Sequence, residues 1–431
     1  MLQQCAYARV AAPFELQLLT LGRQHTVNGG RTDLCQLLPD CRVDSKITTD
    51  IGGTIISGTV TYDGTASISV KIADSVVAAG ETLSVDASAL TDTNTLTWNG
   101  AAETDGAFSI VAGSSASTLT GGACADTFDF TVSGVVFSSA DTVNGGAGSD
   151  IMKIGTVTAT TAFNNVANVE SISFANQAAV SITTVDSLVA SGKTLSVDAT
   201  ALTGSNTFTW NGASESDDKY SIKAGSSNAT ITGGSGADTI VAGSGTNWIC
   251  GGPGIDTITL GSGADTLVFN SLTGTDGISG FTYSADTLTF SVSGVSLLTS
   301  GISIITLAGT TVTASSSVYY TMGNSTLTGS ASTSAVLSVI TGTIASSSAL
   351  LTRLATGGTN AVILSSACSK NSLLLVLYSD GTDAHMVAVG LGTVGTTFTT
   401  SDLTVYEIAT LKGITITSLT DWTAIRLALT N

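Results

Sequence analysis

Four nine-residue segments follow one another without a gap in residues 233–268: GGSGADTIV, AGSGTNWIC, GGPGIDTIT and LGSGADTLV. Glycine stands second and fourth in every segment, Asp or Asn stands sixth, and Ile or Leu stands eighth. A fixed nine-residue period of this kind predicts a parallel β-roll, in which each segment forms one turn and one short strand. The alternative, a flexible Gly-rich linker, would not keep an acid and an aliphatic residue in register over four copies.

The turn positions of these segments are suited to a calcium ion. The glycines permit backbone conformations with positive φ, which allow a tight turn with its carbonyl oxygens on the inside. Carboxylate and carbonyl oxygens are the ligands that Ca²⁺ prefers. We therefore expect calcium ligands at Asp238, Asn247, Asp256 and Asp265, in turns built on Gly234, Gly236, Gly252, Gly254, Gly261 and Gly263.

Stacking of the segments predicts which of these side chains meet. One segment makes half a turn of the roll, so turns two segments apart lie on the same side. Asp238 is then expected to share a row of ions with Asp256, and Asn247 with Asp265. Because Asn247 offers an oxygen without a charge, the second row is expected to bind calcium more weakly.

These segments resemble the repeats-in-toxin (RTX) family. The direct resemblance covers residues 233–269, and residues 277–290 resemble, less specifically, the sequence that often follows such repeats. It implies an all-β fold, a parallel β-solenoid or β-roll with calcium in its turns, followed here by a β-rich C-terminal region. It also implies bacterial type I secretion to the medium or the cell surface. The chain looks most like the surface-layer and adhesin-type members.

A second, longer repeat has a period of 112 residues. The segment that starts with GETLSVDASALTDTNTLTWNG at Gly80 aligns without a gap with GKTLSVDATALTGSNTFTWNG at Gly192. Both copies end in a calcium-type turn, and the alignment matches Asp126 with Asp238. Cys124 replaces a glycine in the first copy, and a side chain at a position that wants positive φ weakens the expectation of calcium at Asp126. Asp150, in GGAGSDIMK, is a better match, and the turn at Asp126 is a candidate partner for it.

Composition limits the classes of function. The 431 residues include 14 Lys and Arg against 32 Asp and Glu, a net charge of −18. No basic patch is available for phosphates, which argues against nucleic-acid binding. No apolar run approaches the roughly 18 residues of a transmembrane helix. The motifs HExxH and GxSxG are absent from the sequence, so zinc-protease and lipase mechanisms are excluded.

Four regions are expected along the chain. Residues 1–46 differ in composition and form a cap, an anchor or a mis-called start. Residues 47–178 and 179–290 form two β-solenoid modules, the second of which ends in the calcium roll. Residues 291–431 form a β-rich C-terminal region with a possible export or assembly role, including a short helix within residues 346–358 and a hairpin within 373–390.

Other residues allow two interpretations each. Trp98 and Trp210 are either core aromatics or sugar-stacking platforms. Asp380, Asp383 and His385 are either turn residues or a catalytic or metal group, and the turn is favoured. The six cysteines show no metal-binding spacing; Cys35 and Cys41 form a disulfide or are buried small residues.

The sequence therefore predicts a secreted structural protein that folds on calcium and self-associates into a homo-oligomer or lattice, as a surface layer, sheath or filament. The alternative is a calcium-dependent adhesin that binds a glycan, such as cell-surface polysaccharide. A third possibility is a solenoid enzyme that acts on polysaccharide. We expect no enzyme, because no catalytic set of residues stands out.

Overall fold

The computed structural model describes residues 67–282 and 284–290 and a set of flanking segments. These are 42–43, 48–51, 58–62, 64, 319–322, 327–329, 337–355, 362–364, 372–393, 398–416 and 426–429. The Cys35–Cys41 prediction lies outside the described residues. The chain divides into two compact units, Met1–Thr207 and Phe208–Asn431. The four regions predicted from composition stay a prediction.

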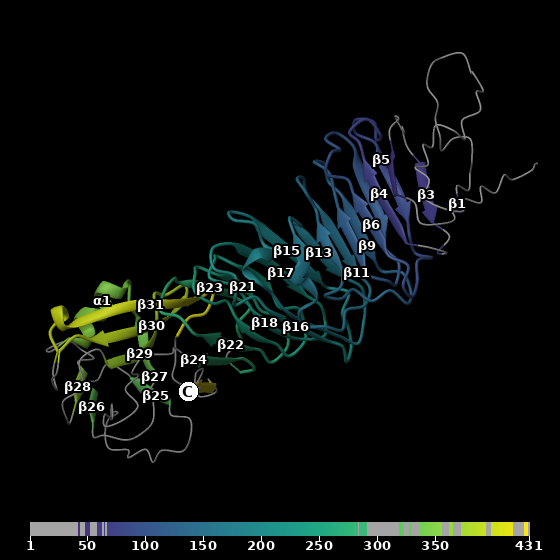
Figure 1. Ribbon diagram of the computed structural model, residues 1–431. Coiled ribbons are helices and arrows are strands. Elements are labelled where there is room, and N and C mark those ends of the chain that lie inside the picture. Colours follow the sequence, from purple (N-terminus) through teal and green to yellow (C-terminus); the bar gives the residue numbers. More distant parts are fainter. Residues whose placement is uncertain are drawn as a thin grey trace, which may run out of the picture. The chain divides into compact units, whose positions relative to one another are not determined.

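The first unit winds its strands alternately through two parallel sheets (Figure 1). One sheet contains β1 (Arg42–Val43), β3 (Gly58–Tyr62), β5 (Thr82–Asp86), β7 (Ala107–Val111), β9 (Thr127–Phe130), β11 (Ile151–Ile154), β13 (Ser171–Phe174) and β15 (Thr194–Ala199). The other contains β2 (Thr48–Ile51), β4 (Ile68–Ile72), β6 (Leu96–Asn99), β8 (Ser117–Thr120), β10 (Thr142–Asn144) and β12 (Val166–Ala167). Strand β14 (Ala179–Thr183) and the short helices η2 (Ala162–Asn165) and η3 (Asp186–Leu188) complete the unit. Successive coils pair in parallel, so the predicted all-β parallel β-solenoid is confirmed.

The second unit has the same winding, followed by C-terminal strands that pair partly in parallel and partly antiparallel. Its solenoid strands are β16 (Thr207–Asn211), β17 (Lys219–Ala224), β18 (Asn228–Thr232), β19 (Thr239–Val241), β20 (Trp248–Cys250), β21 (Thr257–Thr259), β22 (Thr266–Phe269), β23 (Asp276–Ser279) and β24 (Thr287–Phe290). The C-terminal strands are β25 (Tyr319–Met322), β26 (Leu327–Gly329), β27 (Leu337–Thr343), β28 (Val362–Leu364), β29 (Ser372–Ser379), β30 (Ala384–Leu391), β31 (Leu403–Leu411) and β32 (Arg426–Leu429). Odd-numbered β17–β23 form one parallel sheet and even-numbered β18–β24 another.

The last solenoid coil is paired on both sheets by C-terminal strands. Strand β31 pairs in parallel with β23 and, on its other edge, antiparallel with β30. Strand β32 pairs in parallel with β24. The backbone N–H of Lys412 also donates to the carbonyl oxygen of Ile278 over 2.7 Å. The edge that the solenoid would otherwise expose is therefore occupied by the chain itself.

The predicted helix and hairpin of the C-terminal region are both confirmed. Helix α1 spans Ser347–Leu354, and the hydroxyl of its N-cap Ser346 accepts the N–H of Ala349. Strands β29 and β30 pair antiparallel around a turn at residues 380–383. Buried Leu350, Leu354 and Val376 belong to a hydrophobic cluster beneath this sheet. Among the described residues, none of the helices has the length and apolar character needed to cross a membrane.

The nonapeptide pattern builds the solenoid core because each short strand turns one aliphatic side chain inward. Ile222, Ile240, Ile258 and Ile278 stand in direct register on β17, β19, β21 and β23, and each is at most 2% exposed. Burying one such side chain contributes roughly 1.5–3 kcal/mol. The stack of identical inward positions explains why strands of only three or four residues hold together.

Trp98 and Trp210 serve as core residues in the two copies of the longer repeat. Both are fully buried. Trp98 meets Phe108 edge-on at 5.4 Å between ring centroids, and Trp210 meets Tyr220 in the same way at 5.6 Å. Such pairs add about 0.5–1.5 kcal/mol beyond their buried area. The core interpretation is confirmed, and neither ring is available for stacking on a sugar.

Candidate metal centre

The turns of the nonapeptides bring each loop against the loop of the preceding coil. In residues 251–256, Gly252 and Gly254 have φ of 106° and 130°, where side chains are strained. A Cβ on either would also collide with a carbonyl oxygen of the preceding loop, at Gly234 and Gly236 respectively. Glycine is thus required here for two reasons, backbone conformation and close approach.

The sixth-position carboxylates form a ladder along one corner of the second unit. The backbone N–H of Tyr220 donates to Oδ1 of Asp238 over 2.7 Å, and that of Asp238 donates to Oδ1 of Asp256 over 2.8 Å. The N–H of Asp256 donates in turn to Oδ1 of Asp276 over 3.0 Å. The predicted pairing of Asp238 with Asp256 is therefore present, and the row extends one coil further.

A second ladder runs along the opposite corner. The N–H of Asn247 donates to Oδ1 of Asp265 over 2.9 Å, and the N–H of Asp265 donates to Oδ1 of Asp286 over 2.9 Å. The predicted pairing of Asn247 with Asp265 is therefore also present. Each ladder has one carboxylate or amide per coil, all at most 8% exposed.

The first unit contains the same arrangement. The N–H of Phe108 donates to Oδ1 of Asp126 over 2.6 Å, and that of Asp126 donates to Oδ1 of Asp150 over 2.7 Å. The N–H of Asp150 donates to Oε2 of Glu170 over 2.8 Å. The structure thus brings Asp126 and Asp150 together as candidate partners, although 24 residues separate them, against 18 between Asp238 and Asp256.

The argument that Cys124 occupies a position of positive φ is wrong. Neither Cys124 nor its counterpart Gly236 has positive φ. Gly236 is small for a different reason, because a Cβ there would collide with the carbonyl oxygen of Asp218. In the first copy the Cys124 thiol instead lies 3.7 Å from the carbonyl oxygen of Thr104. The backbone conformation at Cys124 therefore gives no reason to exclude an ion at Asp126.

Several ladder carboxylates have one oxygen that finds no hydrogen-bond donor. Oδ2 of Asp150, Asp256 and Asp265 is buried without a partner. Burial and, second to it, neighbouring carboxylates raise the pKa of Asp256 to about 8. Burial likewise raises the pKa of Asp150 to about 7. In the described coils, no lysine or arginine forms an ion pair with these three groups.

This donor set fits a hard divalent cation. Buried like charges with unpartnered oxygens are costly unless a cation neutralises them. Carboxylate oxygens from two adjacent coils, together with glycine-loop carbonyls, are the ligands that Ca²⁺ takes in large number. Asp238 with Asp256, and Asp126 with Asp150, are the residue pairs that would hold it.

A family model of the RTX calcium-binding nonapeptide repeat matches the chain in four copies, at residues 109–131, 138–153, 224–258 and 242–276. The chain carries RTX repeats in a β-roll. The matched residues include both ladders of the second unit, except for Asp286, and the Asp126 and Asp150 turns of the first. RTX nonapeptides bind calcium, and proteins that carry them are typically extracellular or secreted. No curated protein and no solved structure matched this RTX chain.

The nonapeptide pattern did not predict four acids that accept a backbone N–H from the preceding coil, among them Asp141, whose Oδ1 accepts the N–H of Ser117 over 2.8 Å. The other three are Glu170, Asp276 and Asp286. A shorter signal would have found two of them, because the tripeptide Ala-Asp-Thr occurs at Asp141 and Asp286 as well as at Asp126, Asp238 and Asp265. Glu170 and Asp276 lack it and lie at irregular spacing, so they are recognised only in three dimensions.

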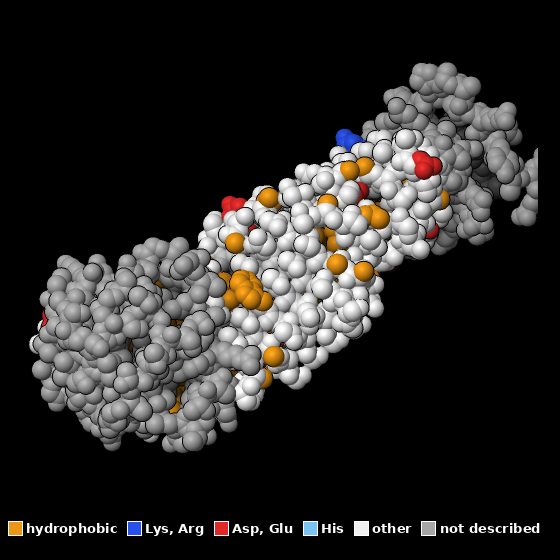
Figure 2. All heavy atoms as spheres, turned by 90° about the horizontal axis from the view of Figure 1, so that it is seen from below, with side chains coloured by type: hydrophobic (Ala, Val, Ile, Leu, Met, Phe, Trp, Pro, Cys, Tyr) orange, Lys and Arg blue, Asp and Glu red, His pale blue; other side chains and the backbone are white. Residues whose placement is uncertain are grey.

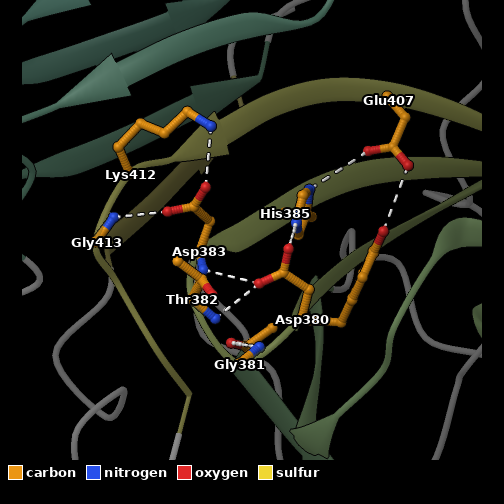
Figure 3. Close-up of polar contacts among 10 residues, drawn as sticks. Asp380, Gly381, Thr382, Asp383, His385, Glu407, Lys412 and Gly413 are labelled. Atoms are coloured by element: carbon orange, nitrogen blue, oxygen red, sulfur yellow. Dashed lines mark hydrogen bonds and ion pairs between the residues drawn. The ribbon is translucent and has the colours of Figure 1, made fainter.

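Asp380 and Asp383, the acids near His385, belong to a hairpin turn rather than to the RTX ladders (Figure 3). Oδ1 of Asp380 accepts the backbone N–H groups of Thr382 and Asp383, while its Oδ2 lies 3.2 Å from Nε2 of His385. These contacts hold the pKa of Asp380 at about 2, the two backbone donors being the main cause. Asp383 pairs with Lys412 over 2.9 Å. Each side chain therefore has a structural partner, in agreement with the turn interpretation.

Proposed function

We propose that this RTX protein is a secreted structural protein, which folds when calcium binds and then self-associates at the cell surface as a layer, sheath or filament. The observation that carries the calcium step is that a buried carboxylate with an unpartnered oxygen stands in each ladder described above, at Asp150, Asp256 and Asp265. Without a cation these charges oppose folding, and with one they join adjacent coils.

Calcium would act as a gate on folding. Sites in extracellular modules have Kd values on the order of 10⁻⁴–10⁻³ M, above the calcium concentration of a cytoplasm. At ten times Kd, each occupied site adds about 1.4 kcal/mol to the stability of the folded state. A few such sites together match a substantial share of the roughly 5–15 kcal/mol that stabilises a typical domain. The chain would then stay open for export and close outside.

The character of the surface supports self-association. Figure 2 shows a face on which acidic and basic side chains are few and widely separated among the described residues. Many acids of the chain are withdrawn into the ladders, so they do not contribute to repulsion at this surface. Outward positions of the parallel sheets bear small polar residues, among them Thr239, Thr257 and Ser279. Flat faces of this kind can pack laterally against a second copy.

A calcium-dependent adhesin is the second candidate. Trp98 and Trp210 no longer support it, since both are buried. The observation that still favours it is Trp248 on β20, which is 38% exposed between Thr230 and Thr266 of the neighbouring strands. We propose further that the chain is not an enzyme. The contact between His385 and Asp380 of the hairpin turn supports this.

Electron microscopy of the purified chain in millimolar calcium and in chelator tests the proposal. We expect ordered sheets or fibres in calcium, and dispersed, less folded protein in chelator. Persistent folded monomers in calcium would reject self-association. If the Trp248→Ala variant then bound polysaccharide more weakly than wild type, that result would favour the adhesin. Circular dichroism that does not change on chelation would reject the calcium gate.

A further inference from the structure

The side-chain amide of Asn247 occupies the corner where an RTX loop would otherwise face an ion. Its Nδ2 donates to the carbonyl oxygen of Gly245 over 2.8 Å and to that of Ala242 over 3.4 Å. The same nitrogen donates to Oδ1 of Asp265, in the next coil, over 2.9 Å. One NH₂ group thus joins two carbonyls of its own loop to the carboxylate of the adjacent loop.

These acceptors are the kinds of oxygen that a calcium ion would collect at this corner. At the opposite corner the register places Asp238 in the equivalent position, where its Oδ2 accepts the backbone N–H of Gly234 over 2.8 Å and donates nothing, while Oδ2 of Asp256 in the next coil has no donor at all. Asn247 therefore differs from Asp238 in function and not only in charge. It brings its own donor to the oxygens, and an ion could not contact the same oxygens while the amide does.

The orientation of the amide is fixed by the preceding coil. Oδ1 of Asn247 accepts the backbone N–H of Ala229 over 3.0 Å. A flipped amide would place its NH₂ group against that N–H and would turn its oxygen toward the carbonyl of Gly245. With Asn247 only 2% exposed, no water would compensate, and each buried unsatisfied group costs about 1–3 kcal/mol.

We propose that the Asn247 amide replaces the calcium ion between the loops at residues 242–247 and 260–265. This level of the second ladder is then closed without calcium, while the level of Asp238 and Asp256 in the first ladder requires it. The inference rests on the proposed calcium dependence of the other corner. It also replaces the sequence-based expectation of a weak site at Asn247 with that of no site.

The charges at the two corners agree with this division. At the calcium corner, Asp238, Asp256 and Asp276 follow one another, and burial and, second to it, neighbouring carboxylates raise the pKa of Asp256 and of Asp276. At the other corner the neutral Asn247 precedes Asp265. Burial raises the pKa of Asp265, and the hydrogen bonds from Asn247 act against that rise. The corner with the amide has less charge to neutralise.

Asp265 retains one free oxygen for the next level of the ladder. Its Oδ1 is used by Asn247, whereas its Oδ2 has no partner. An ion that uses Oδ2 would lie on the side of Asp286 and would not need Asn247. The proposal therefore concerns one level of the ladder, and it predicts a change of one ion when that level is altered.

The decisive variant is Asn247→Asp in the full chain, with bound calcium counted by equilibrium dialysis. Removing the NH₂ group and adding a carboxylate should create a site, so the variant should bind one more ion than wild type. In chelator the variant should unfold at a lower temperature than wild type, and calcium should restore it. Asn228→Asp is the matched control: Asn228 is exposed and its Oδ1 accepts the N–H of Thr246, which a carboxylate can also do. It should leave the count unchanged.

Equal calcium counts in wild type and Asn247→Asp would overturn the proposal. If Asn247→Asp does not fold, Asn247→Ala gives a second test. The alanine variant should lose stability equally in calcium and in chelator, whereas the loss of a bound ion would overturn the proposal. The proposed function fails separately, if wild type binds no calcium at all. In that case, binding of a single ion by Asn247→Asp would still support the replacement. If Asn247→Asp also bound no ion, the replacement would be overturned.

Discussion

Replacing Asp256 by asparagine should stabilise the calcium-free protein. Oδ1 of Asp256 accepts the N–H of Asp238, which an amide oxygen can also accept, and Oδ2 has no donor. Burial raises the pKa of Asp256 from 3.8 to about 8, so the folded, metal-free chain takes up a proton at neutral pH. At about 1.4 kcal/mol per pKa unit, keeping this group neutral at pH 7 costs up to about 4 kcal/mol. An asparagine side chain at this position would be neutral without that cost.

The raised pKa of Asp256 makes the stabilisation by Asp256→Asn depend on pH. A carboxyl whose pKa is raised on folding opposes folding more strongly as pH rises from 3.8 to about 8. At pH 5 the same reasoning leaves a cost of only about 2 kcal/mol. The advantage of Asp256→Asn over wild type in chelator should therefore grow between pH 5 and pH 7.

Urea denaturation followed by circular dichroism, at both pH values in chelator and in calcium, measures these differences. The variant should also respond less to calcium than wild type, because a ligand of one site is lost. Asp383→Asn, a change at an acid of the hairpin turn, should show neither effect. The reasoning is refuted if Asp256→Asn is no more stable than wild type in chelator at pH 7, or if its advantage does not depend on pH.

Three further changes test the ladder and the core. Gly254→Ala should destabilise the roll by at least about 1 kcal/mol in thermal unfolding, since φ is 130° and the Cβ would strike a carbonyl oxygen; Gly192→Ala, with positive φ but open space, should cost less. Trp98→Ala should cost about 3–5 kcal/mol in urea unfolding, and a loss below about 1 kcal/mol would contradict its place in the core. Asp276→Ala should weaken calcium binding in equilibrium dialysis, whereas Asp383→Ala should not; equal effects would remove Asp276 from the candidate site.

The solenoid was predictable because its local and global periods coincide. One nonapeptide supplies a turn, an inward aliphatic residue such as Ile258 and a ladder position such as Asp256, so the pattern along the chain repeats the pattern in space. Helix α1 and the β29–β30 hairpin were also predictable, because a Ser cap and a polar turn are local signals.

What the sequence could not reveal depends on residues from different coils. Asp276 joins the ladder after a coil of 20 residues, which breaks the nine-residue period. The orientation of the Asn247 amide is fixed by Ala229, a whole coil earlier, so an oxygen ligand was expected where a nitrogen donor stands. The pairing of β31 with β23 joins segments that lie far apart in the chain, and no local pattern signals it.

The pairing of β31 and β32 with the last coil bears on how copies of this chain can meet. Parallel stacking of one solenoid on another end to end requires free main-chain donors and acceptors at the joint, and here those of β23 and β24 are already used within the chain. Direct main-chain pairing of a second copy onto β23 and β24 is therefore closed. Copies of the chain would instead meet through side chains on the lateral faces of the roll. The spacing of an ordered array would then be set by the width of the roll rather than by its coil repeat.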